Sequence, residues 1–278
     1  MTKLKRIIKT IIKSLPFNIP EFIANTRTRS AVFFSRPIKT DKILLQQPRP
    51  KVTVICLIYK SIGYLDFVWK SFNKYTKNAD FLFVANDATD KVKKYLKDNN
   101  LPHLIFENED KNEHYLRRVY RAYNYGGMNA PGEIIVFVNS DMAFSSGWLE
   151  NLIKNLNKNR IVCSRLVESG KLFSGRNAIM KNFGQTYKDF NEEKFEKYAQ
   201  KIKKPELYKG GLFMPCAIYK DAFIKSGGYP IGNRKEFDGS ETSGDNILFY
   251  ERLKPMGIEH YTVFDSIVYH IQEGEMSE

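Results

Sequence analysis

Three apolar segments of strand length each end in side chains that can do chemistry. Tyr59 ends the first segment, Asp87 ends the second, and Asn139 and Asp141 end the third. An aromatic ring can stack on a nucleobase, one carboxylate can accept hydrogen bonds from a base or a ribose, and another can hold a divalent cation with its hard oxygen atoms. Each acid alone also fits a helix cap or a turn. In this order along one chain, they indicate a nucleotide-diphosphate site with a metal.

The elements that must position these residues alternate between strands and helices. The apolar segments predict strands over 52–59, 81–87, 103–108, 133–141 and 161–167, with helices over 65–75, 90–99, 113–129 and 147–158 between them. Strands that are apolar throughout and separated by helices predict an α/β fold with a parallel sheet covered on both faces. Such a sheet binds its ligand beyond the carboxyl ends of its strands.

The alternation fades after residue 168. The sequence then predicts a helix at 191–203, a strand at 211–219, a short helix ending at Gly227 and Gly228, a helix at 244–256 and an apolar run ending in His270. We therefore expect a basic arm over 1–50 and one domain over 51–278. Within that domain, 51–167 is expected to bind the nucleotide, and 168–278 the other substrate.

Composition excludes several classes of protein. The 278 residues contain 42% hydrophobic and 27% charged side chains, which is ordinary for a globular domain, and no apolar run is long enough to span a membrane. Three scattered cysteines (Cys56, Cys163 and Cys216) are too few for a disulfide framework, so we expect buried free thiols in a reducing compartment.

The net charge of +13 is concentrated near the N-terminus. Residues 1–50 hold eleven Lys and Arg against two acids. Within them, KLKRIIKTIIKSL (3–15) places its Leu and Ile residues at helical spacing, with five cations off that stripe. This pattern predicts a basic amphipathic helix on an anionic membrane surface. The alternative is that the helix docks on the body of the protein.

The first strand is followed by neither GxGxxG nor GxxxxGK[ST], which argues against a dinucleotide-binding dehydrogenase and a P-loop NTPase. The chain instead resembles a family 2 glycosyltransferase of the GT-A fold over about residues 51–271. The resemblance lies in five segments in the family's order: VTVICLIYK, LFVANDATD, YLRRVYRAYNYGGMNAPGEIIVFVNSD, FMPCAIYKDAFIKSGGYP and SGDNILFYERLKPMG.

The resemblance implies a donor site. Tyr59 matches the tyrosine beside the base, Asp87 the acid that contacts the base, and Arg118 an arginine that contacts the phosphates. Asp141 matches the metal ligand of the family's Asp-x-Asp motif, which here reads Asn139-Ser140-Asp141. Asn139 can hydrogen-bond the ribose or a metal-bound water, but it lacks charge. The affinity for the metal is therefore expected to be lower than with the family's Asp-x-Asp motif.

The resemblance also implies a C-terminal metal ligand, which His270 fits, although a histidine that ends an apolar strand is often structural. A Mn²⁺ or Mg²⁺ ion suits such an oxygen-rich site. Asp245, in the first turn of the 244–256 helix, matches the catalytic base, with Asp238 and Glu241 as rivals and an N-cap as the structural alternative.

We therefore expect a metal-dependent, inverting glycosyltransferase that moves a sugar from a nucleotide-diphosphate sugar, with a UDP-sugar favoured, to a glycan or lipid-linked acceptor. It is expected to be cytoplasmic and peripheral on the inner face of the membrane. One alternative is a sugar nucleotidyltransferase, which would normally carry a Gly-rich loop after the first strand. The other is a non-catalytic membrane- or nucleic-acid-binding protein, which the concentration of charge in the arm disfavours. The sugar, base and acceptor stay open.

Overall fold

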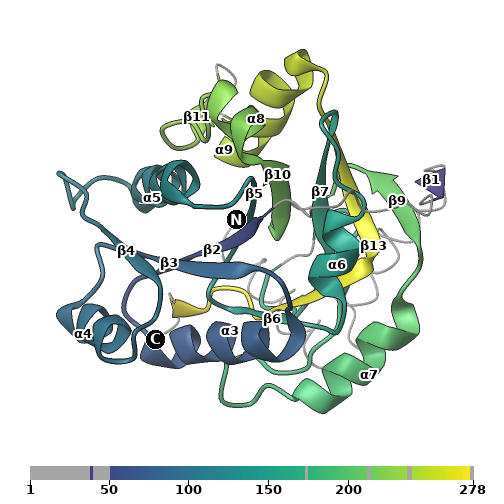
Figure 1. Ribbon diagram of the computed structural model, residues 1–278, viewed down its shortest axis with the longest axis horizontal. Coiled ribbons are helices and arrows are strands. Elements are labelled where there is room, and N and C mark those ends of the chain that lie inside the picture. The colour runs from purple at the N-terminus through teal and green to yellow at the C-terminus, as the bar shows by residue number, and fades with distance from the viewer. Residues whose placement is uncertain (1–37, 40–50, 173–174, 212–213, 237–239, 276–278) are drawn as a thin grey trace, which may run out of the picture.

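The structure is a computed structural model that describes residues 38–39, 51–172, 175–211, 214–236 and 240–275 (Figure 1). The predicted helix over 3–15 lies outside the described residues. No helix among those described is long and apolar enough to cross a membrane.

Four parallel strands form one half of the central sheet. They are β2 (Val52–Ile58), β3 (Asp80–Asn86), β4 (His103–Phe106) and β5 (Ile134–Val138). The helices between them are α3 (Ile62–Tyr75), α4 (Asp90–Asp98) and α5 (Tyr115–Asn129). Ser61 and Thr89 cap α3 and α4 with their side-chain oxygens, so these helices begin directly after the strand ends.

The other half of the sheet mixes directions. Its strands are β7 (Arg160–Glu168), β9 (Glu206–Lys209), β10 (Cys216–Tyr219), β13 (Glu259–His270) and β1 (Ile38–Lys39). The strand order is β1-β9-β13-β7-β10-β5-β2-β3-β4, so strands from distant parts of the sequence interleave in one sheet. Two short strands pair outside this order, β6 (Met142–Phe144) with β13 and β8 (Ile179–Met180) with β7.

The remaining elements surround the second half. They are α6 (Trp148–Ile153), α7 (Glu192–Ile202), α8 (Lys220–Lys225), the hairpin of β11 (Arg234–Lys235) and β12 (Glu241–Thr242), and α9 (Gly244–Asn246). α9 continues as a π-helix over Ile247–Leu253 and a 3₁₀ turn over Lys254–Met256. The predicted helix over 244–256 is therefore present, with a changed hydrogen-bonding pattern.

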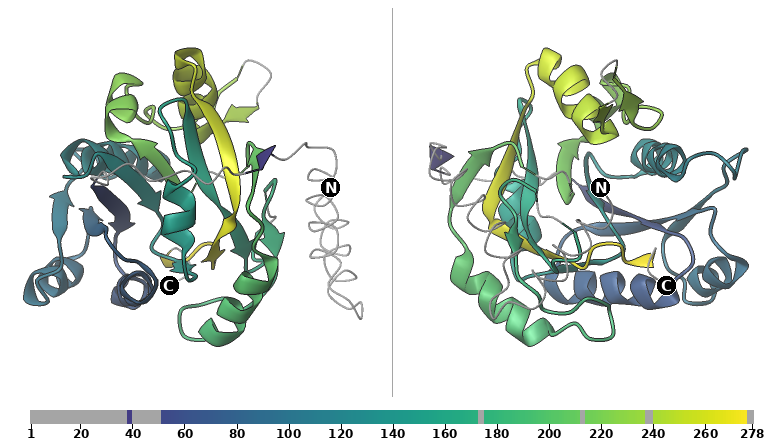
Figure 2. Two further views of the ribbon diagram at one scale, coloured as in Figure 1. Left: turned by 45° about the vertical axis from the view of Figure 1, so that its right-hand side comes forward. Right: turned by 180° about the vertical axis from the view of Figure 1, so that it is seen from behind.

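The two faces of the sheet are covered by different helices. Val54, Cys56 and Ile58 of β2 pack with α3, α4 and α6 on one face, and Ile55 packs with α5 and α8 on the other. Figures 1 and 2 show α5 and α8 on one side of the sheet and α3 and α4 on the other. The alternation follows from the two-residue period of a strand, and it confirms the predicted α/β sheet with both faces covered.

The direction of the strands places several of their carboxyl ends at one edge of the sheet. β2, β3, β4 and β5 are mutually parallel, and β10 runs antiparallel to both β5 and β7. β7 therefore runs with β5, and β13 is parallel to β7. The carboxyl ends of β2, β3, β5, β7 and β13 consequently share one edge of the sheet.

Three expected elements differ from the structure. The predicted strand over 133–141 ends at Val138, because the chain turns at Asn139–Asp141 before β6. The predicted helix over 147–158 ends at Ile153, and the predicted strand over 211–219 is a strand only from Cys216. The three cysteines are free and buried, as expected.

Candidate active site

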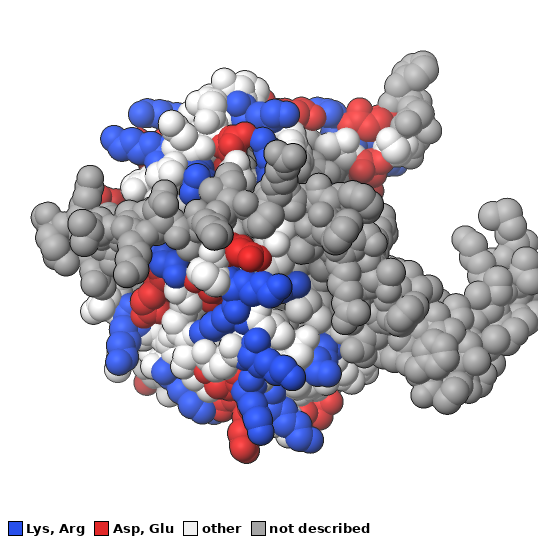
Figure 3. Space-filling view, turned by 90° about the vertical axis from the view of Figure 1, so that its right-hand side faces the viewer, with Lys and Arg blue, Asp and Glu red and all other residues white. Residues whose placement is uncertain are grey.

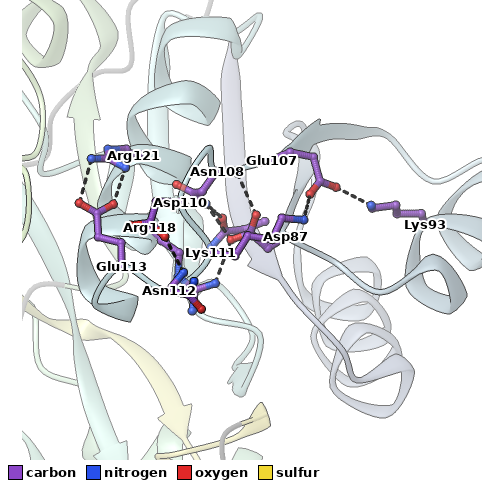
Figure 4. A network of polar contacts seen from close by, with 11 residues as sticks. Asp87, Lys93, Glu107, Asn108, Asp110, Lys111, Asn112, Glu113, Arg118 and Arg121 are labelled. Atoms are coloured by element: carbon purple, nitrogen blue, oxygen red, sulfur yellow. Dashed lines mark hydrogen bonds and ion pairs between the residues drawn. The ribbon is translucent and has the colours of Figure 1, made fainter.

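Asp87 lies at the carboxyl end of β3 and is held there from three directions. Its carboxylate accepts hydrogen bonds from the backbone N–H of Asn108 at 2.8 Å, from the Asn108 side chain at 2.9 Å and from Arg118 at 3.0 Å (Figure 4). Burial alone would raise the pKa of Asp87, but these donors and the Arg118 charge lower it overall. Asp87 is therefore a fixed, ionised acceptor.

Arg118 reaches this edge from the first turns of α5. Its Nη1 pairs with Asp87, whereas its buried Nε has no hydrogen-bond partner among the described residues. A buried donor without a partner is costly unless a ligand satisfies it. Arg118 is therefore suited to bind an anion while it holds Asp87 in place.

Around this pair, charged side chains alternate in sign. Glu107 bridges Lys93 and Lys111, and Glu113 pairs with Arg121 (Figure 4). These pairs offset part of the charge that surrounds the buried Asp87–Arg118 pair.

Tyr59 follows β2 and is 43% exposed, so its ring is available for stacking. Its carbonyl oxygen accepts from the Thr89 N–H at 3.0 Å, which ties the end of β2 to the turn after Asp87. The structure therefore brings the ends of these two strands together, as the direction of the strands requires.

Asp141 lies on the turn after β5 and contacts the C-terminal segment of the chain. Its Oδ1 is 3.4 Å from His270 Nε2, and its Oδ2 accepts from the Gly274 N–H at 3.1 Å. Burial alone would raise the pKa of Asp141, but the neighbouring His270 charge lowers it overall. Asp141 is thus ionised and next to the predicted second ligand.

His270 lies between two carboxylates. Its Nδ1 is 3.1 Å from Glu168 Oε1, at the end of β7, while Nε2 faces Asp141. Burial would lower its pKa, but Asp141 and then Glu168 raise it overall. A carboxylate on Nδ1 is the arrangement that orients an imidazole whose other nitrogen binds a metal. Glu168 also ends an apolar strand, so the strand-end argument used for Tyr59 and Asp87 could have found it.

Asn139 is fixed by a tyrosine of α5. The Tyr123 hydroxyl is 3.0 Å from Asn139 Oδ1. Burial raises the pKa of Tyr123, and the nearby carboxylates of Asp245 and Asp141 raise it further. Tyr123 therefore lies between the turn at Asn139–Asp141 and Asp245, although that turn and Asp245 are far apart in sequence.

Asp245 faces two tyrosines, Tyr120 and Tyr229. The N-cap of its helix is Ser243, whose Oγ accepts from the Asn246 N–H at 3.2 Å, so Asp245 is not needed as the cap. Burial raises the pKa of Asp245 to about 6, and the Tyr229 and Tyr120 hydroxyls oppose that rise. Its rival Glu241 is exposed on β12, and Asp238 lies outside the described residues.

Glu275 joins the ends of β2 and β5. Its carboxylate accepts from the backbone N–H groups of Tyr59 at 3.2 Å, Lys60 at 2.7 Å and Ser61 at 3.1 Å, and from Ser140 Oγ at 3.0 Å. No strand or helix pattern surrounds Glu275, so local sequence patterns do not predict this contact. Glu275 places the C-terminal segment across the strand ends that hold Tyr59 and Asp141.

The contacts of Asp141 limit the kind of metal site that can form here. The described residues contain no group of three or more His, Cys, Asp or Glu that could hold a metal ion. At this edge, one carboxylate and one imidazole have facing atoms 3.4 Å apart. Two such ligands fit a divalent cation whose remaining positions are filled by the oxygens of a diphosphate or by water.

A sequence comparison matches most of the domain. The model of the family described as glycosyl transferase family 2 matches residues 53–224. These residues include Tyr59, Asp87, Arg118, Asn139 and Asp141, whereas Asp245 and His270 lie beyond them.

Two solved structures share the fold. One is a crystal structure of GalNAc-T7 with UDP, GalNAc and Mn²⁺, at a TM-score of 0.55 and 16% identity, covering 96% of this chain and 52% of that chain. The other is the mannosyltransferase PcManGT from Pyrobaculum calidifontis in complex with GDP-Man and Mn²⁺, at a TM-score of 0.52 and 15% identity, covering 91% of this chain and 64% of that chain. This chain thus spans about half to two thirds of their lengths.

Proposed function

The chain belongs to glycosyl transferase family 2, and we propose that it moves a sugar from a nucleotide-diphosphate sugar, with inversion, to a hydroxyl of a glycan or lipid-linked acceptor. The observation that carries the proposal is the shared sheet edge. The Asp87–Arg118 pair and the Asp141–His270 pair both lie at the carboxyl ends of the strands or directly beyond them. Open α/β sheets bind their ligands at that edge.

The donor would bind across the ends of β2, β3 and β5. Tyr59 would stack on the base, and Asp87 would accept from a base N–H. The Nε of Arg118, which has no partner among the described residues, would donate to the diphosphate. Asn139, held by Tyr123, would receive the ribose or a metal-bound water. We favour a UDP-sugar as the donor. Of the two solved structures that share the fold, one contains UDP and the other contains GDP-Man.

A Mn²⁺ or Mg²⁺ ion would be held by Asp141 and His270, and both neighbouring structures contain Mn²⁺. Such an ion supplies Lewis-acid stabilisation of the leaving diphosphate. Glu168 orients the His270 ring, and Asn139 replaces the first acid of the family's motif. Affinity for the ion is therefore expected to depend on Asp141 more than on Asn139.

Asp245 would be the general base that accepts the proton of the attacking hydroxyl. A carboxylate whose pKa is near 6 is mostly ionised at neutral pH and is a stronger base than an ordinary aspartate. The half of the domain that contains Asp245, residues 168–278, would bind the acceptor. Residues 1–15 would bind an anionic membrane surface, which is consistent with a lipid-linked acceptor.

The deciding experiment compares two acid-to-amide variants in a sugar-transfer assay. Asp245→Asn is expected to lower kcat by about 10²–10⁴-fold while the Kd for the nucleotide diphosphate stays unchanged. Glu241→Gln, close in sequence and exposed, is the matched control and should keep its activity. Full activity of Asp245→Asn would remove Asp245 from the mechanism.

A further inference from the structure

Helix α7 presents a line of lysines to solvent. Lys194, Lys197 and Lys201 are exposed and follow helical spacing, and Lys204 continues the line just beyond the helix. None of the four forms an ion pair with a described residue, whereas Lys74 and Lys209 nearby are both paired. We call these four residues the lysine stripe. Its helical part is about 10 Å long.

The opposite face of α7 supports the candidate active site. Phe195 and Ala199 are buried in a hydrophobic cluster with Tyr269 and Ile271 of the C-terminal region. The Phe195 and Tyr269 ring centroids are 5.5 Å apart. Tyr269 and Ile271 flank His270, so α7 lies one packing layer behind the proposed metal ligand.

The lysine stripe adjoins the edge of the sheet that holds the described part of the arm. β9 begins two residues after Lys204, and it pairs with β1 (Ile38–Lys39), which follows the basic sequence of the arm. Figure 3 faces this side of the molecule, where Lys and Arg side chains gather over the lower half with fewer acids between them. β1 and the lysine stripe therefore lie on the same side of the domain.

We propose that the lysine stripe is a second membrane-docking surface, which binds anionic lipid headgroups together with the arm. Lysines that form no ion pair with the described part of the chain, lined up on one helix face, fit a flat anionic surface, and each adds electrostatic attraction to such lipids. The proposal extends the membrane contact proposed for residues 1–15. It would place α7 on the lipid, with the His270 end of β13 directly behind it.

The test measures partition of the full chain onto phosphatidylcholine vesicles with and without phosphatidylserine. The variant Lys194→Gln/Lys197→Gln/Lys201→Gln should bind phosphatidylserine vesicles at least about tenfold more weakly. Glutamine keeps helix propensity, so the helix should persist. The matched control is Lys91→Gln/Lys94→Gln/Lys97→Gln, which removes three exposed lysines from α4 on the other side of the molecule (Figure 1). It should change binding by less than about twofold.

Equal losses in the two variants would show that only net charge matters, and no loss in the α7 variant would show that the lysine stripe does not touch lipid. Either result overturns the proposal, as does binding of the stripe to duplex DNA in place of vesicles. Sugar transfer to a soluble acceptor, measured without vesicles, should be the same in both variants. A failure of the proposed function is thereby distinguished from a failure of lipid docking.

Discussion

Among single residues, Asp245 has the environment with the clearest chemical consequence. Burial raises its pKa to about 6, while the Tyr229 and Tyr120 hydroxyls hold it down. A general base works only when it is ionised. Its raised pKa therefore sets the pH below which transfer should fail.

The pH profile of transfer should show this ionisation. We predict that kcat/KM is level above about pH 7 and falls about tenfold per pH unit well below pH 6, since the protonated carboxyl cannot accept the proton. Tyr120→Phe removes a hydroxyl that lowers the pKa, so the acid limb should move to higher pH. An ordinary carboxyl has a pKa of about 4. An acid limb at that pH, unchanged by Tyr120→Phe, would contradict the assignment of Asp245 as the base.

The Asp87–Arg118 pair makes a prediction about stability. The Asp87 side chain is only 4% exposed, and Arg118 is one of the groups that lower its pKa. Arg118→Ala should therefore reduce the free energy of unfolding at neutral pH by about 1–3 kcal/mol. A depressed pKa stabilises the fold above the unfolded value of about 3.9, and this stability is lost as pH falls through the folded value. The deficit should thus shrink in acid.

Urea unfolding at neutral and at acid pH measures this effect. Arg117→Ala is the control, because Arg117 is half exposed and its partner Glu113, 3.3 Å away, also pairs with Arg121. It should cost less than about 1 kcal/mol. A deficit for Arg118→Ala that is the same at both pH values would mean that the Asp87 charge is not responsible.

The candidate residues could be predicted wherever an apolar strand ended in a polar side chain. Tyr59, Asp87 and Asp141 were found in this way, because parallel strands bring their carboxyl ends to one edge. Glu275 could not be found, since its contacts with Lys60 and Ser61 join residues more than two hundred positions apart. No local pattern specifies such a contact.

Among helices and strands, local patterns predicted most helices and the buried parallel strands with small differences at either end. β9 was missed because its sequence, Glu206–Lys209, is half polar and lies in a lysine-rich region. Its strand conformation depends on pairing with β13 and β1. The interleaving of β13 and β10 with the parallel strands likewise depends on long-range pairing.

The contacts of the C-terminal segment Ile271–Glu275 with the strand ends lead to a prediction about amide exchange. Glu275→Ala removes the acceptor for the Tyr59, Lys60 and Ser61 N–H groups, next to Gly274, whose N–H donates to Asp141. Amide exchange at Lys60, Ser61 and Gly274 should accelerate by about tenfold or more, while exchange in the β5 core stays slow. Glu273→Ala, at an exposed neighbour, is the control and should leave these amides protected.

Over the molecule as a whole, charge is distributed unevenly. Most of the net charge of +13 belongs to residues 1–50, whereas 51–278 are close to balanced. A domain that bound nucleic acid through its folded surface would carry its excess there. The arm is therefore the part of the sequence that most strongly indicates an anionic partner.

Deletion of residues 1–15 tests that indication. The full chain should bind phosphatidylserine vesicles more weakly as salt rises, because the attraction is screened. The shortened chain should lose most of this binding and keep its sugar-transfer activity on a soluble acceptor. Unchanged vesicle binding after the deletion would argue against a membrane role for the arm.

The proposed chemistry depends on Tyr59, Asp87, Arg118 and Asp141 binding one nucleotide diphosphate together with a divalent metal. Calorimetry of UDP binding, with and without Mn²⁺, measures this dependence. We expect Mn²⁺ to strengthen UDP binding to the native chain, Asp141→Ala to abolish this enhancement, and Arg118→Ala to weaken binding with or without the metal. If UDP and the other nucleoside diphosphates bind Asp141→Ala and Arg118→Ala as tightly as the native chain, the proposed donor site is wrong.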